Sequence, residues 1–249
     1  MWCSNANCSI ARALRLSCRP NLALIPRMTL SNKFAALSTA DECLAEDAAK
    51  GNVKAAAARA RNRFENPLVW VDLEMTGLDI EKDTIIEIAV IITDGDLKEE
   101  AVGPALAIHA SEEVLAGMNE WCIEHHGQSG LTQRVRDSAV TMQQAEEQVM
   151  AFIQQYVSEA GTAQMAGNSV HVDRMFLNKH MPTLVSFLSY RIVDVSSVKE
   201  LARRWFPKEY RQAPRKKLAH TALSDIKESL AELRYYRKAV FKSGGSSKS

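Results

Sequence analysis

The sequence predicts a mixed α/β domain in which helices cover a central sheet. Three runs of β-branched and apolar residues follow one another near the start of the domain, and apolar stripes at helical spacing come after them. A further short run, RIVDV, predicts one more strand between the helical segments. This order favours one sheet packed against helices. With 249 residues and 46% hydrophobic content, the chain is long enough for one such domain with appendages, which we expect over residues 67–241.

The three predicted strands begin at Leu68. They are LVWVDLEMTGL, then TIIEIAVIITD after the polar turn EKD, and then AVGPALAIHA. Their length and β-branched content are typical of strands, so we expect them to be adjacent in one sheet.

Two segments show the period of an amphipathic helix. In AEEQVMAFIQQYV an apolar stripe recurs every three or four positions, made of Val149, Phe152, Ile153, Tyr156 and Val157. The last segment, residues 221–240, repeats this spacing with Leu223, Ile226, Leu230, Leu233 and Val240. We therefore expect the domain to end on a helix that faces the core.

The first forty residues differ in composition from the domain. They contain several serines, no acidic residue, and five basic residues, which are Arg12, Arg15, Arg19, Arg27 and Lys33. This composition predicts an organellar transit peptide over residues 1–40 and a mitochondrial protein, with the chloroplast as the alternative organelle. An ordinary disordered tail has the same composition, and Met28 offers an internal start that would give a cytosolic form.

The segments that flank the domain predict linkers. Residues 41–66 mix alanine with both charges and indicate a solvated helix or a linker, and residues 242–249 predict a disordered tail. No apolar stretch reaches the roughly 18 residues that cross a bilayer, so we expect no membrane contact. The net charge of +1 restricts any recognition of phosphates to local sites.

Asp72 and Glu74 are the first candidate metal ligands. They are two residues apart in a predicted strand, and the period of a strand sends both side chains to the same face. A divalent cation would accept this pair of carboxylates, but an exposed strand edge explains the pattern about as well.

Three further polar residues have ordinary explanations when each is taken alone. Asp173 follows the turn GNS at the start of a predicted helical run, residues 174–180, where a helix N-cap alone would justify it. Asp225 borders the apolar stripe of the last helix, where an acid is usually just solvated. His220 comes five residues earlier, so we place it on the loop that enters this helix.

Together, and in this order, these motifs resemble the DEDDh exonucleases, a family named for four acids and a histidine. The stretches WVDLEMTGLD, GNS, YR followed by DVS, KELARRW and HTALSDIKESLAEL are most similar to the oligoribonuclease family. The resemblance covers the whole predicted domain. It implies an RNase H-like fold and a 3′-to-5′ exoribonuclease that degrades very short RNA to nucleoside 5′-monophosphates. It also implies two Mg²⁺ or Mn²⁺ ions, held by Asp72, Glu74, Asp173 and Asp225, with His220 as general base.

The same resemblance implies the substrate contacts. Leu78 would wedge between two bases, and Trp121 and His126 would lie near the nucleotides, although Trp121 could instead be a core residue and His125 is adjacent. Ser169, Tyr190 and Arg191 match positions that cap the 5′ phosphate. In the family this tyrosine comes from a second subunit, so a homodimer is implied. Val172 departs from the family, where a glutamine is common, and puts one substrate hydrogen bond in doubt.

Other functions stay open at this point. The main alternative is a DEDDh exonuclease that acts on longer RNA or on DNA ends, and a second is an inactive module that binds nucleic acid. A structural α/β protein with accidental acids is a third. The basic stretch of residues 203–217 either draws nucleic acid towards the site or is a solvated loop.

Overall fold

The structure, a computed structural model, describes residues 64–214 and 221–242. In this part of the chain a single five-stranded sheet has the order β3-β2-β1-β4-β5. Its strands are β1 Leu68–Met75, β2 Ile85–Thr93, β3 Glu100–Ala107, β4 Gln164–Gly167 and β5 Ile192–Asp194. The first three strands pair antiparallel. Strand β4 pairs parallel with β1, and β5 pairs parallel with β4. The predicted mixed sheet is therefore confirmed, including the three adjacent opening strands and the late strand in RIVDV.

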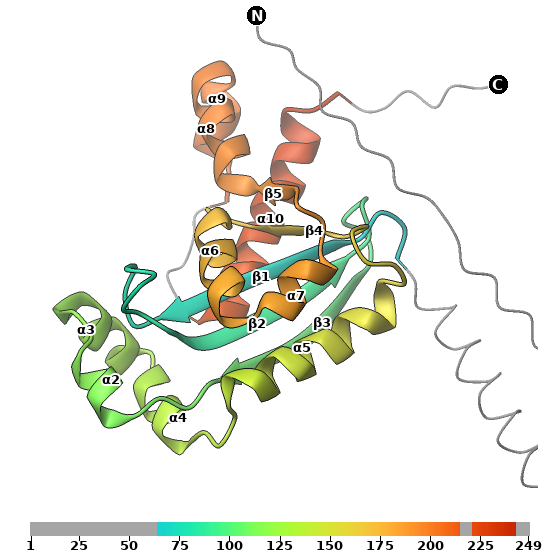
Figure 1. Cartoon of the computed structure of the whole chain (residues 1–249). Helices are drawn as coiled ribbons and strands as arrows, with labels where there is room; N and C mark the ends of the chain where they lie inside the picture. Colours follow the sequence, from blue (N-terminus) through green and yellow to red (C-terminus); the bar gives the residue numbers. More distant parts are fainter. Residues whose placement is uncertain (1–63, 215–220, 243–249) are drawn as a thin grey trace, which may run out of the picture. The chain divides into compact units, whose positions relative to one another are not determined.

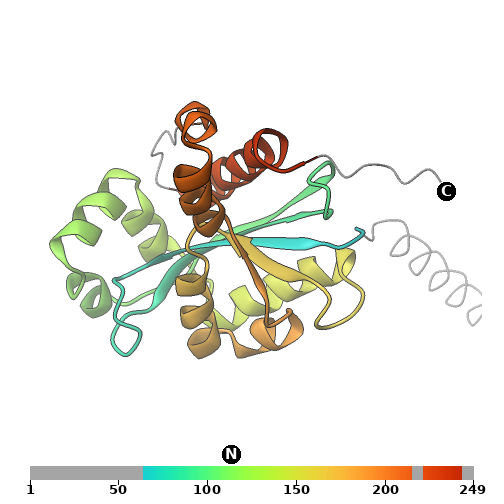
Figure 2. The same cartoon turned by 90° about the horizontal axis from the view of Figure 1, so that it is seen from above.

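Helices cover both faces of this sheet (Figure 1 and Figure 2). Helices α5, α6 and α7 lie on one face, and α8 and α10 lie on the other, while α2, α3 and α4 gather beside the carboxyl end of β1. Their bounds are α2 Glu112–Ala116, α3 Glu120–Gln128, α4 Leu131–Asp137, α5 Met142–Tyr156, α6 His171–His180, α7 Pro182–Phe187, α8 Val195–Trp205, α9 Pro207–Gln212 and α10 Ala222–Ala239.

The alternation of β1 divides the core between the two faces. Val71 and its neighbours at every second position pack against α5, α6 and α7, where Val149 and Ile153 of the predicted stripe are fully buried. Trp70 points to the other face and packs with Ile226 and Leu230 of α10. Because side chains alternate along a strand, Asp72 and Glu74 continue the Trp70 face, towards α10.

Several elements were not predicted. Strand β4 has only four residues, QMAG, and the helices α2, α3, α4, α7 and α9 are too short to show a clear apolar period, whereas α8 has an apolar stripe that sequence reasoning missed. Among the described residues, no helix is long and apolar enough to cross a membrane. The predicted transit peptide, nearly all of the predicted linker and the predicted tail from residue 243 onward lie outside the described residues.

Candidate active site

Three of the four predicted metal ligands form a cluster. Asp72 and Glu74 come from β1, and Asp225 comes from the first turn of α10, which packs on that face of the sheet. One carboxylate oxygen of each residue lies within 4.8 Å of the others, and all three residues are partly exposed. The cluster therefore has the oxygen donors and the access that a hard divalent cation requires.

Asp173, the fourth predicted ligand, lies beside this cluster but is not one of its three members. It is 7% exposed, and its Oδ1 accepts a hydrogen bond from the backbone N–H of Leu73 at 3.0 Å. This hydrogen bond links α6 to β1 at the residue next to Glu74. The predicted start of this helix was wrong: α6 begins at His171 after Val170 as N-cap, so Asp173 lies within the first turn and is not a cap.

Burial raises the pKa of two of the carboxylates, Glu74 and Asp173. Burial raises the pKa of Glu74 to about 8, and the charges of Glu87, Asp225 and Asp173 add to this effect. Burial likewise raises the pKa of Asp173 to about 7, despite its hydrogen bond from Leu73. So many acidic groups in a half-buried site are stable as anions only beside positive charge, and the site therefore fits a divalent cation.

A pocket of about 400 Å³ opens directly beside Glu74. Leu78, Trp121 and His126, the three residues expected near the bases, all line it. Leu78 is 76% exposed and Trp121 is 57% exposed, so the alternative that Trp121 is a core residue is wrong. An exposed apolar and aromatic surface of this kind is suited to stacking with a nucleobase.

His126 is the histidine that belongs to this pocket. It is buried, its Nε2 lies 2.9 Å from the backbone oxygen of Met75, and its Nδ1 lies 3.9 Å from Glu74 Oε2. A carbonyl oxygen only accepts, so Nε2 carries the proton. Burial lowers the pKa of His126, which favours the neutral ring. The adjacent His125 instead stacks on the Trp121 ring, with ring centroids 3.9 Å apart.

The residues expected to cap the 5′ phosphate occupy two places. Ser169 follows β4, has a positive φ of 52°, and donates its N–H to Asp194 Oδ1 at 2.9 Å and its hydroxyl to Ser196 Oγ at 3.2 Å. Tyr190 and Arg191 precede β5 and are exposed, with the Arg191 guanidinium 4.7 Å from the Tyr190 ring centroid. Because β4 and β5 run parallel, the two groups lie towards opposite ends of this strand pair.

His220 lies outside the described residues, so its predicted role as base is not tested. Helix α10 begins at Ala222, after His220, as predicted. Most of the described part of the basic stretch is helical rather than a loop, because α8 runs to Trp205 and α9 covers Pro207–Gln212. Val172 packs against the core on the α6 side of the sheet.

Sequence reasoning missed Glu87, a buried carboxylate of β2. It lies opposite Glu74 in the β1–β2 pairing and contacts Arg134 of α4. The available signal was a single acid inside the apolar run IIEIAVIIT, since an acid in such a strand is buried only with a partner. Ser196, which hydrogen-bonds Ser169, was missed as well.

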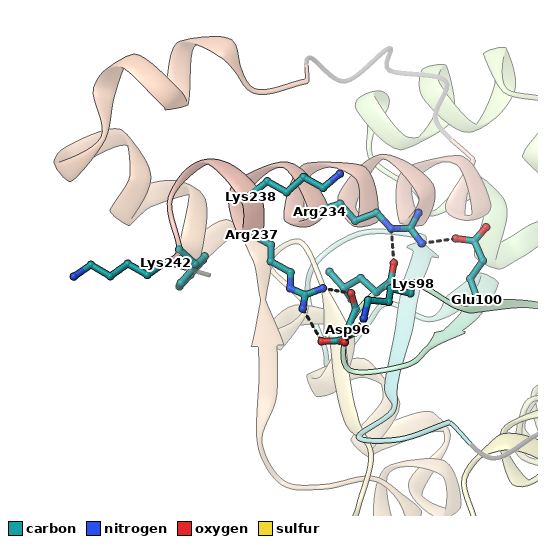
Figure 3. Close-up of a pocket in the computed structure, with 9 residues that line it drawn as sticks. Asp96, Lys98, Glu100, Arg234, Arg237, Lys238 and Lys242 are labelled. Atoms are coloured by element: carbon teal, nitrogen blue, oxygen red, sulfur yellow. Dashed lines mark hydrogen bonds and ion pairs between the residues drawn. The ribbon is translucent and has the colours of Figure 1, made fainter. Parts of the chain in front are cut away.

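A larger cavity, about 1150 Å³, lies at the other end of α10 (Figure 3). Its arginines bind the turn between β2 and β3 and the start of β3: Arg234 donates to the Leu97 backbone oxygen and to Glu100, each at 2.9 Å, and Arg237 donates to Asp96 at 2.6 Å. These ion pairs hold the turn against the helix. The cavity is therefore a feature of the surface far along α10 from Asp225, rather than part of the carboxylate site.

Comparison with known proteins finds relatives that cover most of this chain. A family model described as Exonuclease (RNase_T) matches residues 69–233. The chain is 54% identical over 187 residues to the mitochondrial oligoribonuclease of Mus musculus, covering 75% of this chain and 78% of the relative. It is 46% identical over 217 residues to the oligoribonuclease of Arabidopsis thaliana, and the match covers 86% of this chain and 97% of the relative. A Pseudomonas aeruginosa oligoribonuclease is 53% identical over 181 residues, and the match covers 72% of this chain and 99% of the relative.

Solved structures share the fold. The zinc-bound complex of Escherichia coli exonuclease I with single-stranded DNA superposes with a TM-score of 0.55 at 13% identity, over 70% of this chain and 41% of that one. An exonuclease I of Methylocaldum szegediense superposes with a TM-score of 0.51 at 19% identity, over 70% of this chain and 41% of that one. This chain thus spans about two fifths of these larger enzymes, and the likeness confirms the predicted RNase H-like fold.

Proposed function

Because this chain belongs to the exonuclease family, we propose that it is a 3′-to-5′ exoribonuclease that hydrolyses very short RNA to nucleoside 5′-monophosphates. One observation carries the proposal: the pocket that presents Leu78 and Trp121 has Glu74 of the carboxylate cluster in its wall. A nucleotide whose base lies in this pocket would have its phosphate next to the acids. The names of relatives that are 46–54% identical over most of the chain support RNA as the substrate.

We propose that the cluster works with two Mg²⁺ or Mn²⁺ ions, held by Asp72, Glu74, Asp173 and Asp225. When bound, such ions supply a polarised water and neutralise charge on the phosphate. The chain's part is to hold the carboxylates in place, and the hydrogen bond from Leu73 to Asp173 does this for the most buried of them. The raised pKa values of Glu74 and Asp173 support a site built to be neutralised by cations.

His220 is proposed as the general base that takes a proton from the attacking water. An imidazole with an ordinary pKa of about 6.5 is suited to this step near neutral pH. Its place in the chain, two residues before the helix whose first turn carries Asp225, supports the role. A His220→Ala variant is expected to keep Mn²⁺ binding in calorimetry and to lose turnover, with part of the loss recovered at higher pH.

The proposed substrate contacts divide by chemistry. Leu78 and Trp121 stack with the bases, and His126 borders the nucleotide next to Glu74. Ser169, Arg191 and Tyr190 bind the 5′ phosphate; because Ser169 and the Tyr190–Arg191 pair lie towards opposite ends of β4 and β5 in one subunit, a second subunit of a homodimer is proposed to bring this pair to Ser169. The 73% exposure of Tyr190 supports this contribution, because its ring is open to another copy of the chain.

The proposed location is the mitochondrion. The relative from Mus musculus is named as mitochondrial, and the basic, acid-free segment of residues 1–40 supports an import signal. Fusing this segment to a fluorescent protein, with a fusion that begins at Met28 as the control, would show whether it directs import.

The decisive experiment incubates the purified protein with Mn²⁺ and 5′-labelled RNAs of two, five, ten and twenty residues, and with DNA of the same lengths. The proposal predicts the highest kcat/KM on the two-residue RNA, with nucleoside 5′-monophosphates as products. The matched control is Asp225→Asn, which keeps the size of the side chain but removes a ligand charge. It should fold normally and lose roughly a thousandfold in kcat, since metal stabilisation supplies several kcal/mol. Preference for the twenty-residue RNA or for DNA would support the longer-substrate alternative.

A further inference from the structure

Glu87 is a buried carboxylate in the otherwise apolar strand β2. It is 2% exposed and lies directly opposite Glu74 in the antiparallel pairing of β1 with β2. Burying a carboxylate is costly unless its oxygens are hydrogen-bonded or paired with a cation. Both oxygens of Glu87 have such a partner, and the two partners come from different elements of the fold.

One partner is the start of α10. The Oε2 atom of Glu87 accepts a hydrogen bond from the backbone N–H of Ala222, the first residue of this helix, at 3.4 Å. Within the described part of the chain, the N-cap residue Thr221 makes no side-chain cap. The first N–H groups of a helix need acceptors, and the positive end of the helix favours a carboxylate. Glu87 therefore caps α10 from a neighbouring strand.

The other partner is Arg134 of α4, whose Nη1 contacts Oε1 of Glu87. Helix α4 packs on α3 through a buried cluster that includes Cys122 and Leu131. Helix α3 carries Trp121 and His126, which line the pocket for the base. The pair between Glu87 and Arg134 therefore ties the pocket side of the site to the same strand that holds α10.

We propose that Glu87 is a positioning residue of the active site. By capping α10 and pairing with Arg134, it fixes Asp225 and the carboxylate cluster relative to the pocket for the base. The inference rests on the proposed function, because this spacing matters only if a nucleotide reaches from the pocket to the cluster. The distance between a bound base and its scissile phosphate is set by covalent geometry, so the protein must match it.

Three variants and one control separate positioning from stability. Glu87→Gln keeps an oxygen for Ala222, whereas Glu87→Met removes it at similar length. The matched control is Glu232→Met, because Glu232 is also buried, lies on α10, and pairs with Lys199 at 3.1 Å, but it is about two helical turns from Asp225. We expect Glu87→Met to lower kcat on a 5′-phosphorylated RNA dinucleotide by about a hundredfold, the typical effect of a 1 Å misplacement. Glu87→Gln should retain most of kcat, and Glu232→Met should lower the melting temperature without this loss.

Arg134→Gln distinguishes positioning from a direct effect of charge. Removing a cation near the carboxylates would tighten Mn²⁺ binding if charge alone mattered, and it would leave kcat unchanged. Positioning predicts lower kcat with no gain in Mn²⁺ affinity, as measured by calorimetry on the metal alone. Because the Arg134 side chain is 43% exposed, this variant tests the inference even if Glu87→Met does not fold.

Two results would overturn the inference. One is a kcat for folded Glu87→Met equal to that of Glu232→Met. The other is tighter Mn²⁺ binding by Arg134→Gln at unchanged kcat. A wild-type protein that binds Mn²⁺ but hydrolyses no RNA would be a different result, because it would remove the proposed function itself.

Discussion

Asp83 folds over Gly77 in the loop between β1 and β2, so closely that a Cβ atom on residue 77 would meet Asp83 Oδ2 at 2.4 Å. The same carboxylate accepts hydrogen bonds from the Thr76 hydroxyl at 2.9 Å and from the Asp79 N–H at 2.8 Å. These hydrogen bonds hold the loop between β1 and β2 in one conformation. Leu78 follows Gly77 in this loop and is 76% exposed where it lines the pocket beside Glu74.

We predict that Gly77→Ala displaces Asp83 and moves Leu78 away from the bases. The expected result is a loss of about tenfold or more in kcat/KM on an RNA dinucleotide, because misplacing a group that orients the substrate is costly. Steady-state kinetics would measure it. The control is Gly127→Ala on α3, where a Cβ meets nothing within 4 Å, and it should leave kcat/KM unchanged. Equal activity of the two variants would show that the shape of this loop does not position the substrate.

Trp121→Ala should weaken binding rather than the chemical step. Stacking of one base contributes about 1 to 3 kcal/mol, so KM for a dinucleotide should rise by roughly tenfold to a hundredfold while kcat changes less. Ile123→Ala is the matched control, since Ile123 is 48% exposed on the same helix but does not line this pocket. A KM that is unchanged by Trp121→Ala would exclude stacking on the indole.

The stability of the metal-free protein should fall as the pH rises. Burial raises the pKa of Glu74 to about 8 and that of Asp173 to about 7, so the folded protein holds protons that the unfolded chain has released. The free energy of unfolding therefore decreases between about pH 5 and pH 8, where the folded state binds more protons. Melting temperatures in the presence of a chelator would measure this slope.

Bound Mn²⁺ should remove that slope. The ion requires ionised carboxylates, so it should raise the melting temperature more at pH 8 than at pH 5, and near pH 7 binding should release protons to the buffer. Calorimetry in buffers of different ionisation enthalpy would detect this release. Glu74→Gln, which cannot ionise, should flatten the pH dependence of the metal-free protein, and a wild-type curve that is already flat would argue against the raised pKa values.

Arg191→Ala tests the proposed phosphate contact. A charge-assisted hydrogen bond contributes about 1.5 to 3 kcal/mol, so the variant should lose roughly tenfold to a hundredfold of its preference for 5′-phosphorylated over unphosphorylated dinucleotides. Cleavage of a ten-residue RNA should change much less. Arg136→Ala is the control, because this exposed arginine pairs with Glu112 on the surface. An equal loss on both dinucleotides would remove the phosphate role.

Local patterns predicted the parts of the site that depend on neighbours in the chain. Alternation along β1 placed Asp72 and Glu74 on one face, and the spacing of the last helix placed Ile226 in the core. The meeting of Asp225 with the β1 acids depends on how α10 packs across the sheet, which spacing alone does not contain. It was predicted only through the resemblance of whole motifs.

Other features could not be predicted, for physical reasons that differ from one to the next. Strand β4 is four residues long and contains no β-branched side chain, so it lacks the usual strand signal. The exposure of Trp121 depends on α3, a short helix whose apolar residues do not form one stripe. The proposed role of Glu87 depends on partners on α4 and α10 that are distant in the sequence.

The carboxylate cluster joins β1, the first strand of the sheet, to α10, the last described helix. During synthesis a ribosome makes the domain from its amino end, so Asp72 and Glu74 emerge long before Asp225 does. Until α10 has been made and has docked, the nascent chain presents an incomplete set of acids to the metal. On the proposed metal site, a chain whose α10 has not yet docked lacks the Asp225 ligand, so activity is expected to appear only when folding is complete.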